Sequence, residues 1–488
     1  MSNALLSTDA GAWDPKRHRA GIVHIGIGAF HRAHQAVYTD AALAAKGGDW
    51  RIIGVSLRST DIADALNDQD GLYHVIVRYP DGAKVQQIRS LSHVLAASRG
   101  IEPVLAALAA PATRIVTITV TEKAYGIDRA SGGIVADHPA IAHDLHHPGE
   151  PSGLIGILVE GLRRRRDAGL HPFTVLSCDN LPENGVLLRA GVIDFARRLD
   201  ATLADWIARN GAFPSSMVDR ITPAATAKTA ADVLTLTGHE DLAAVETEPF
   251  SQWVIEDHFP LGRPAWEIGG ALLVGDVKPY EHMKLRMLNG SHSLIAYLGV
   301  LAGYRYVRDV MADPQFAALV RQHLASAAAT LEPLPGIDFA VYGDDLVERF
   351  KNPEIAHETR QIAMDGTEKL PQRILIPVCE ALRDGKPIGS FALAVAAWMA
   401  AMKMLSDQEG LAGISDPRAH DIFDAASTAS DAGSLYDHLS RLPGLFPGEL
   451  LASTIWQQAV TRRLHLILSS GARAVVLAET GVADQGIS

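Results

Sequence analysis

The chain contains very little cysteine. Cys178 and Cys379 are the only two among 488 residues, and they lie far apart in the sequence. Two such residues cannot build a disulfide framework or a CxxC metal motif, so we expect a reducing, cytoplasmic environment.

Positive charge is also in short supply. The 44 lysine and arginine residues are outnumbered by 56 aspartate and glutamate residues, which gives a formal net charge of -12. This balance argues against nucleic acid as a main partner, because phosphate backbones are bound by clustered lysine and arginine. The one basic run, RRRR at residues 163–166, lies near the end of a predicted helix. We interpret it as a solvated C-terminal turn whose charges complement the helix dipole.

Long hydrophobic runs are absent as well. The longest, FALAVAAWMAAM at residues 391–402, is shorter than the roughly 18 residues that indicate a membrane span. We therefore predict a buried helix there and expect no membrane partner. The first 20 residues lack a basic segment followed by an apolar one, so we expect no signal peptide.

The length predicts two or three domains, and the two halves of the chain differ. In the first half, strands are predicted at residues 21–27, 51–57, 114–120 and 172–178, and helices at 31–48 and around 153–169. Apolar strands that alternate with helices are typical of a parallel sheet covered on both faces. Long helical patterns dominate from about residue 278. We predict an α/β domain over residues 1–277 and a mainly α-helical domain over residues 278–488.

The first strand leads into GIGAFHRAH, which resembles a dinucleotide-binding turn. Gly26 and Gly28 allow a tight turn and the close approach of a phosphate, and the helix that follows offers free N–H groups to a pyrophosphate. Ala29, Phe30 and Arg32 belong to the same turn. His31 stands where the third glycine of GxGxxG would be. The motif is incomplete, and plain turn chemistry is the alternative, but the strand–turn–helix context favours a nucleotide.

The second strand is followed by Asp61, the candidate for binding the ribose hydroxyls of NAD. Arg58 and Thr60 nearby could instead accommodate a 2′-phosphate, so NADP is not excluded. Asp61 could also be only the N-cap of the helix that follows.

Polar residues follow the third and fourth strands too. Glu122 and Lys123 come after the third, and Asp179 and Asn180 after the fourth. Ligands of open parallel sheets bind beyond the carboxyl ends of the strands, so these residues are site candidates. The pattern does not place four others further along, which are Asp219, Arg220, Glu256 and Asp257.

The segment KLRMLNGSHS carries three polar residues on a predicted helix. With about 100° of rotation per residue, His292 lies about 80° and Asn289 about 140° from Lys284, so the three share one broad face. Gly290 between them costs about 1 kcal/mol of helix stability relative to alanine and permits close approach of a ligand or another element. The face is either solvated or a lysine acid/base with an amide and an imidazole around a reacting oxygen.

Taken together, these segments resemble the polyol-specific long-chain dehydrogenases. The resemblance covers nearly the whole chain and includes GIGAFHRAHQ, TVTEKAYG, SCDNLPENG, MVDRITPAAT, EPFSQWVIEDHF, KLRMLNGSHS and QIAMDGTEKLPQR. It implies an expanded Rossmann-type NAD-binding domain, a mainly α-helical domain and a site between them. It also implies metal-independent hydride transfer, with a small-molecule polyol or sugar acid as substrate and a monomer or small homo-oligomer as the active form.

The resemblance also implies roles for particular residues. Lys284 matches the acid/base, whose pKa the site should lower from about 10.4. Asn180 and Asn289 match residues that hold the reacting oxygen, His292 a substrate-binding histidine and Glu122 a proton-relay glutamate. The implied cofactor-binding residues are Gly26, Gly28, Ala29, Phe30, Arg32 and Asp61. The implied substrate-binding residues are Asp219, Lys123, Gln361, Lys369 and Arg373.

Two positions bear on the substrate. Lys123 stands where mannitol 2-dehydrogenase has a glycine, and Gln361 where that enzyme has an arginine, so the chain looks more like the fructuronate reductases. Lys123 could pair with a sugar-acid carboxylate, which a neutral polyol lacks, or it could be a solvent-facing loop lysine. We expect the pair D-mannonate and D-fructuronate. The alternative is a mannitol 2-dehydrogenase or D-arabinitol dehydrogenase acting on neutral polyols.

Two other classes compete with this interpretation. His31 and His34 share a helix face and could bind zinc, although packing or capping is the simpler role. A non-catalytic nucleotide sensor is the other class. An enzyme is favoured over it by the presence of the full set Lys284, Asn180, Asn289 and His292.

Overall fold

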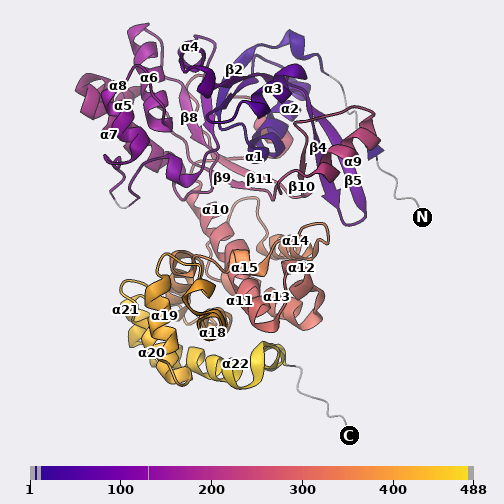
Figure 1. Ribbon diagram of the computed structural model, residues 1–488, viewed down its shortest axis with the longest axis vertical. Coiled ribbons are helices and arrows are strands. Elements are labelled where there is room, and N and C mark those ends of the chain that lie inside the picture. Colours follow the sequence, from indigo (N-terminus) through magenta and orange to yellow (C-terminus); the bar gives the residue numbers. More distant parts are fainter. Residues whose placement is uncertain (1–5, 8–12, 130, 482–488) are drawn as a thin grey trace. The chain divides into compact units, whose positions relative to one another are not determined.

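The computed structural model describes residues 6–7, 13–129 and 131–481. The chain divides into two compact units, Met1–Lys278 (unit 1) and Pro279–Ser488 (unit 2). In Figure 1 the described residues of unit 1 run from indigo to magenta and those of unit 2 end in yellow at α22.

Unit 1 is built on a five-stranded parallel sheet. Its strands are β2 (Ala20–Ile25), β3 (Arg51–Ser56), β6 (Leu91–Ala96), β7 (Ile115–Ile118) and β8 (Thr174–Ser177). They lie in the order β6-β3-β2-β7-β8, and every neighbouring pair is parallel. This is the Rossmann strand order, in which the chain reverses direction across the sheet between the first and fourth strands, here β2 and β7. The predicted parallel α/β fold is confirmed.

Successive side chains of the central strands enter two different cores. Val23 and Ile25 of β2 pack with α4, α6, α7 and α8, whereas Ile22 packs with α2 and α3. Strand side chains alternate between faces, so this division shows a sheet covered by helices on both sides. His24 therefore points to the same face as Ile22, towards α1 and α2.

Within the described residues, two smaller sheets and nine α-helices complete unit 1. The four-stranded sheet has the order β1-β5-β4-β10, from β1 (Leu6–Ser7), β4 (Tyr73–Tyr79), β5 (Gly82–Ile88) and β10 (Val245–Thr247). The three-stranded sheet has the order β12-β11-β9, from β9 (Ser216–Asp219), β11 (Gln252–Glu256) and β12 (Leu272–Val274). The helices are α1 (Ala29–Ala33), α2 (Gln35–Lys46), α3 (Asp61–Asp68), α4 (Glu102–Ala109), α5 (Pro139–His146), α6 (Leu154–Asp167), α7 (Asn184–Leu199), α8 (Ala201–Asn210) and α9 (Ala227–Thr237).

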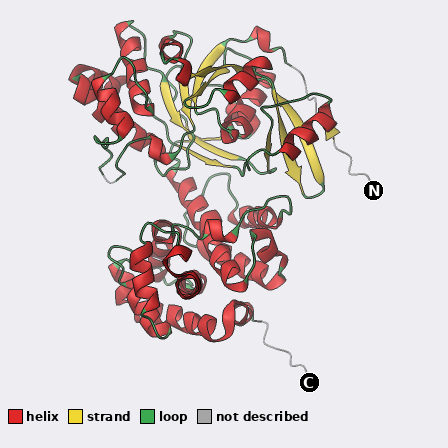
Figure 2. Cartoon of the chain, in the orientation of Figure 1, coloured by secondary structure: helices red, strands yellow, loops and turns green. Residues whose placement is uncertain are grey.

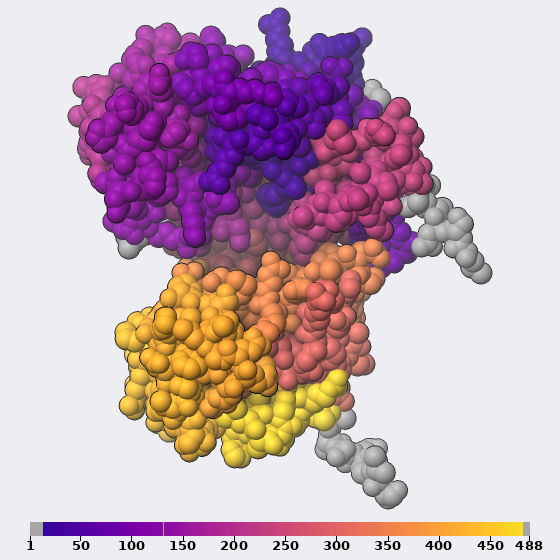
Figure 3. Space-filling view, in the orientation of Figure 1, coloured from indigo at the N-terminus to yellow at the C-terminus, as the bar shows by residue number. Residues whose placement is uncertain are grey.

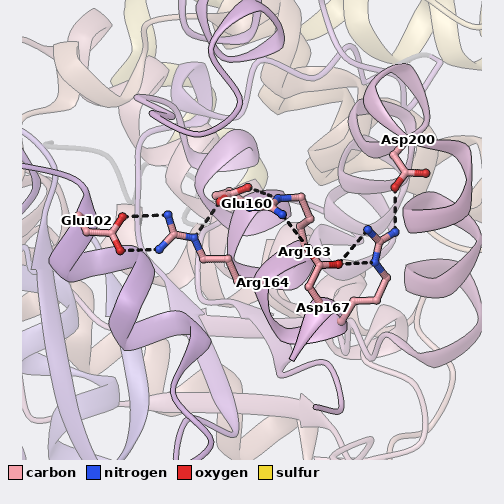
Figure 4. Close-up of polar contacts among 7 residues, drawn as sticks. Glu102, Glu160, Arg163, Arg164, Asp167 and Asp200 are labelled. Carbon is pink, nitrogen blue, oxygen red and sulfur yellow. Dashed lines mark hydrogen bonds and ion pairs between the residues drawn. The ribbon is translucent and has the colours of Figure 1, made fainter. Parts of the chain in front are cut away.

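The arginine run at the end of α6 is not simply solvated, which corrects our interpretation. Arg165 is buried and donates to the carbonyl oxygens of His171 (2.7 Å) and Ala110 (2.7 Å). Its neighbours form a network of ion pairs, in which Arg163 and Arg164 share the buried Glu160 and Arg164 also binds Glu102 (Figure 4). The run connects α6 to α4 and α8 as well as ending a helix.

Among the described residues of unit 2 the regular elements are helices joined by loops, apart from one isolated β-bridge between Tyr306 and Glu358 (Figure 2). Its helices are α10 (Lys278–Met283), α11 (Gly290–Ala302), α12 (Val307–Ala312), α13 (Pro314–Ala328), α14 (Phe339–Lys351), α15 (Thr359–Ile362), α16 (Gly366–Leu370), α17 (Ile376–Arg383), α18 (Gly389–Glu409), α19 (Ala419–Ser427), α20 (Ala432–Ser440), α21 (Gly448–Ala452) and α22 (Thr454–Thr480). In the space-filling view the helices from α19 onward, coloured orange to yellow, form one continuous surface of this unit (Figure 3).

Helix α18 contains the longest apolar run and forms the centre of unit 2. Every residue from Ser390 to Met402 is buried, as predicted. Within the described residues it is the one helix long and apolar enough to cross a membrane, and 78% of its most apolar window is buried inside the protein. Such burial is typical of a core helix.

Candidate active site

The turn after β2 can be made only with glycine at its first position. Gly26 has a φ of +101°, and a Cβ there would overlap the carbonyl oxygen of Thr119 at the end of β7. At Gly28 the nearest atom to a Cβ would be 3.9 Å away, and the residue is exposed. The turn is therefore packed against β7 on one side and open on the other, which fits the diphosphate of a dinucleotide.

The predicted helix after this turn is in fact two helices, because it breaks at His34. This residue has φ -123° and ψ -93°, and it separates α1 from α2. Its ring stacks on Phe30, and its Nε2 is hydrogen-bonded to the carbonyl oxygen of Gln252 (3.0 Å). The bend is thus fixed by contacts with β11, which local sequence does not show.

Arg32 supports the turn from within the protein. Its guanidinium is buried and donates to the carbonyl oxygens of Gly28 and Ala243. Ala29 is partly buried beside it.

Asp61 is the exposed first residue of α3, and its N–H donates to Ser59 Oγ (3.1 Å). Asp61 is therefore not the N-cap of that helix, which corrects one alternative, and its carboxylate faces solvent.

The polar residues after β7 are exposed. Glu122 and Lys123 belong to a short 3-10 helix, η3 (Glu122–Ala124). Glu122 forms an ion pair with Arg129, and the carbonyl oxygen of Lys123 accepts a hydrogen bond from His138 Nε2 (3.0 Å). The backbone of this turn is held in place while the Lys123 side chain reaches solvent.

Asp179 ties the end of β8 to the end of β7. Its carboxylate accepts hydrogen bonds from the N–H of Val120 (2.9 Å) and the hydroxyl of Tyr125 (2.5 Å). Burial raises the pKa of Asp179 to about 7, against the lowering effect of these donors. Asn180, the next residue, is exposed. The structure thus brings the predicted residues of three strand ends together at the carboxyl edge of the sheet.

The buried carboxyl group of Asp179 predicts a pH-dependent stability. Its folded-state pKa lies above the ordinary value of 3.8, so its contribution to folding is greatest below about pH 4 and is lost as the pH rises to about 7. Asp179→Asn should not show this loss, because asparagine does not ionise. As the pH rises over that range, the free energy of unfolding of the variant should therefore increase relative to wild type, by at most about 1.4 kcal/mol per pH unit. Denaturant titrations at several pH values measure it. A difference that is constant with pH contradicts the prediction.

The residues that the sequence pattern did not place lie at the ends of β9 and β11. Asp219 is the last residue of β9 and is buried. Arg220 donates to the carbonyl oxygens of Ala33 and Glu248, which links β9 to α1. Glu256 accepts from the N–H of Ser215 (2.8 Å), and Asp257 pairs with Arg263.

In unit 2 the predicted acid/base lies on a widened helical turn. Lys284 begins a π-helix, η5 (Lys284–Asn289), between α10 and α11, and the N–H of Gly290 donates to the carbonyl of Leu285, five residues back. The rotation per residue used for an ideal α-helix therefore does not apply to this segment. Isolated π-turns are frequent at functional sites. Lys284 is only 7% exposed, so the solvated-face alternative is wrong for this residue.

A second π-helix packs against the first. This is η6 (Pro371–Leu375), and a Cβ at Gly290 would lie 3.2 Å from the carbonyl oxygen of its Arg373. Gly290 therefore serves the close approach of another element. Arg373 in turn donates to the carbonyl oxygen of Asn289 (3.3 Å) and to Ser293 Oγ (3.2 Å). This predicted substrate-binding residue thus holds the turn that carries Asn289.

Asn289 has hydrogen-bonding capacity left over. Its Oδ1 is buried and has no hydrogen-bond partner within the described residues. A buried amide of this kind is well suited to meet a polar ligand, because an unpaired polar atom costs about 1–3 kcal/mol.

The surroundings of His292 are strongly basic. Burial lowers the pKa of His292 well below 6.5, and His357, Arg349, Arg373 and Lys284 lower it further. His292 is thus neutral, and its ring packs on Phe350 (4.7 Å between centroids) and His357 (5.3 Å). We call Lys284, Asn289, His292, Arg349 and Arg373 the lysine site.

Gln361 and Lys369 lie on two short helices of unit 2, α15 and α16. Lys369 donates to the carbonyl oxygens of Met364 (2.6 Å) and Ile362 (3.3 Å), and burial lowers its pKa. Gln361 is exposed on α15. The turn that Lys369 holds contains Asp365, which has a φ of +56°. Strain of this kind is typical of functional turns.

Sequence reasoning missed two residues near Lys284. Glu281 is as buried as Lys284 and precedes it by three residues, which places the two on neighbouring turns of one helix. The spacing Glu-x-x-Lys was the available signal. Arg349 belongs to α14 and is also buried, and only the fold brings it near His292.

Other features of the described residues do not involve these side chains. A cavity of about 400 Å³ in unit 2 is lined by residues of α11, α15 and α18, including the ion pairs Arg305–Glu358 and Arg360–Glu409. Across the described ranges there is no group of three or more His, Cys, Asp or Glu placed to hold a metal ion.

Sequence comparison places the chain among known enzymes. It matches the mannitol dehydrogenase Rossmann domain over residues 20–268 and the mannitol dehydrogenase C-terminal domain over residues 276–440. The chain belongs to the mannitol dehydrogenase family. It is 42% identical to D-mannonate oxidoreductase of Escherichia coli (strain K12) over 472 residues, which cover 96% of this chain and 97% of the relative.

Solved structures of the mannitol dehydrogenase family agree with this assignment. Pseudomonas fluorescens mannitol 2-dehydrogenase, in a ternary complex with NAD and D-mannitol, is 38% identical, with a TM-score of 0.78 over 97% of this chain and 96% of that one. A substrate-free D-sorbitol dehydrogenase is 34% identical, with a TM-score of 0.88 over 96% of both chains. The predicted family is confirmed, and the protein is an oxidoreductase.

Proposed function

We propose that this protein is an NAD-dependent oxidoreductase that interconverts a secondary alcohol of a sugar acid and the matching ketose, with D-mannonate and D-fructuronate as its preferred pair. The observation that carries the proposal is the lysine site, where a buried lysine lies among further cationic groups. A lysine can exchange a proton with an alcohol oxygen, and the surrounding cations favour an anionic substrate.

Unit 1 supplies the cofactor site of this proposal. Gly26 and Gly28 would hold the diphosphate of NAD, and Ala29, Phe30 and Arg32 would complete the turn around it. Asp61, whose carboxylate is exposed, would bind the adenosine ribose. Bound there, NAD would supply the hydride chemistry of the reaction. The related enzyme that was solved as a complex with NAD supports this choice over NADP.

The proton chemistry belongs to the side chains. In oxidation the amine of Lys284 takes the hydroxyl proton, and in reduction its ammonium returns one to the developing alkoxide. Asn180 and Asn289 donate hydrogen bonds to that oxygen. His292, which is neutral, orients the substrate, together with Asp219, Gln361 and Lys369.

A cofactor absorbance assay tests the proposal. Purified protein is given fructuronate, tagaturonate, fructose or xylulose, each with NADH and with NADPH. We expect fructuronate with NADH to give the highest kcat/KM. Faster turnover of fructose than of fructuronate would show that the protein acts on neutral polyols, as mannitol 2-dehydrogenase does.

A charge-removing variant tests the proposed carboxylate contact. Lys123 is exposed at the end of β7, on a turn whose backbone is held by His138. We expect Lys123→Met to lower kcat/KM for fructuronate by about 10- to 100-fold, because one charge-assisted hydrogen bond is worth about 1.5–3 kcal/mol. Arg209→Met, which removes an exposed positive charge on α8 of the same unit, is the control. An equal loss on fructose would show that the contact does not recognise a carboxylate.

Two carboxylates compete for the role of proton relay. We assign it to Glu122 and therefore expect Glu122→Gln to lower kcat about tenfold without changing the affinity for NADH. Glu281→Gln is the matched comparison, because Glu281 is buried one turn from Lys284. Solvent isotope effects on kcat measure the proton step. If Glu281→Gln lowers kcat and Glu122→Gln does not, the proton relay is Glu281 and not Glu122.

A further inference from the structure

The turn after β2 rests on two stacked histidines. His24 in β2 and His31 in α1 are both fully buried, with ring centroids 3.4 Å apart and ring planes inclined by 16°. His31 occupies the place of the third glycine of the dinucleotide fingerprint, where glycine normally lets the helix approach the strand closely. Here the ring lies flat on His24, and this stack sets the separation of α1 from β2.

The hydrogen bonds of His24 define its tautomer and its function. Its Nε2 lies 3.0 Å from the carbonyl oxygen of Gly26 and 2.8 Å from Thr119 Oγ1. The carbonyl can only accept, and the Thr119 hydroxyl gives its own hydrogen to that carbonyl, so Nε2 carries the hydrogen. Its Nδ1 then accepts from the hydroxyl of Thr117 (2.8 Å). The hydroxyl of Thr119 also donates to the Gly26 carbonyl (2.7 Å). Two donors below the turn therefore fix the peptide of Gly26. Burial lowers the pKa of His24 to about 3, which keeps this neutral tautomer.

His31 contributes its shape to this arrangement. Both of its ring nitrogens are buried and lack a hydrogen-bond partner among the described residues. Burial lowers the pKa of His31 well below 6.5, so the ring is neutral. Leaving buried ring nitrogens unpaired is costly, so the contribution of the His31 ring is its packing on His24.

We propose that the His24–His31 stack is a cofactor-positioning element. It holds the Gly26 carbonyl and the first turn of α1 so that the open side of the turn, at Gly28, faces the diphosphate. The inference rests on the proposed function, because that assigns the turn to NAD. Neither histidine is proposed to touch the cofactor.

Binding measurements on the cofactor-free protein test the stack. The variants are His31→Ala, which removes the ring, and His31→Phe, which keeps a flat ring without nitrogens. NADH is titrated by fluorescence, ADP-ribose by calorimetry and adenosine by competition. We expect His31→Ala to raise the Kd of NADH and ADP-ribose by about tenfold or more while the Kd of adenosine is unchanged, since only the first two carry the diphosphate. His31→Phe should restore both to within about threefold.

Thr119→Val provides a milder second variant, in case His31→Ala does not fold. It keeps the side-chain shape and removes one of the two donors to the Gly26 carbonyl. It should raise the Kd of NADH and of ADP-ribose about threefold and leave the Kd of adenosine unchanged.

The possible failures are distinguishable. If the wild-type protein does not bind NADH, the proposed function fails. If wild type binds NADH and His31→Ala binds it equally well, the stack does not position the cofactor. An equal loss of affinity for all three ligands would also overturn the inference, and so would a lower melting temperature with unchanged affinities. Either result would show that the two histidines only stabilise the fold.

Discussion

Replacement of Lys284 by alanine is expected to lower kcat by about 10²- to 10⁴-fold while the affinity for NADH stays close to that of wild type. The side chain is buried at the start of η5, in unit 2, whereas the glycine turn that we assign to the cofactor lies in unit 1. Loss of the amine should therefore remove the proton exchange and leave the cofactor turn intact. Steady-state kinetics and NADH fluorescence titration measure the two quantities separately.

Arg286 provides the matched control for this variant. It lies two residues further along the same π-helix and is equally buried, but it binds Glu380 (2.5 Å) and the carbonyl oxygen of Thr330 (2.8 Å). We expect Arg286→Met to lower the melting temperature, because it removes a buried guanidinium that binds the partly exposed Glu380 and the Thr330 carbonyl oxygen, and to reduce kcat far less than Lys284→Ala. Near-normal turnover of Lys284→Ala would exclude Lys284 as the acid/base.

Replacement of Gly26 by alanine is expected to abolish cofactor binding or to prevent folding of unit 1. The added Cβ would overlap the backbone of Thr119, and the φ of +101° is a conformation that alanine rarely adopts. Since both obstacles are in the backbone, no side-chain rearrangement can relieve them. We expect a loss of several kcal/mol in the free energy of unfolding, at the upper end of single-residue effects. Thermal unfolding and NADH titration are the measurements.

Gly28→Ala separates folding from binding at the same turn. Its Cβ would have one neighbour, the Gly26 carbonyl oxygen at 3.9 Å, and the residue does not have a positive φ. The variant should fold like wild type. A loss of NADH affinity in this folded variant would show that the open side of the turn contacts the cofactor. Wild-type stability and affinity in Gly26→Ala would contradict the account of the turn given above.

The strands of the central sheet could be predicted from the sequence where they are uniformly apolar. Four of the five central strands were predicted, because residues such as those of β7 and β8 are buried on both faces and rich in β-branched side chains. Strand β6 was missed, since its residues have a mixed burial pattern. The β4–β5 hairpin and the three-stranded sheet were missed as well, although the PDG turn between β4 and β5 is a hairpin signal.

For the candidate site, the sequence by itself determined the residue types and the strand ends that carry them. Gly26, Asp179 and Asn180 follow strands whose order places their carboxyl ends at one edge, a consequence of parallel topology. The family, and with it the oxidoreductase activity, also follows from the sequence. The segments KLRMLNGSHS and QIAMDGTEKLPQR were each recognised as resembling family motifs, but the sequence did not show that they pack against each other.

Only the tertiary structure decided what those side chains touch. The approach of Arg373 to Gly290 joins positions 83 residues apart, and the stack of His31 on His24 replaces a glycine by a ring that a local motif would reject. Burial of Lys284 likewise depends on α13 and η6, which pack against η5. The physical reason is the same in each case: local sequence specifies backbone conformation and polarity, whereas close contacts and desolvation arise from chain segments that are distant in sequence.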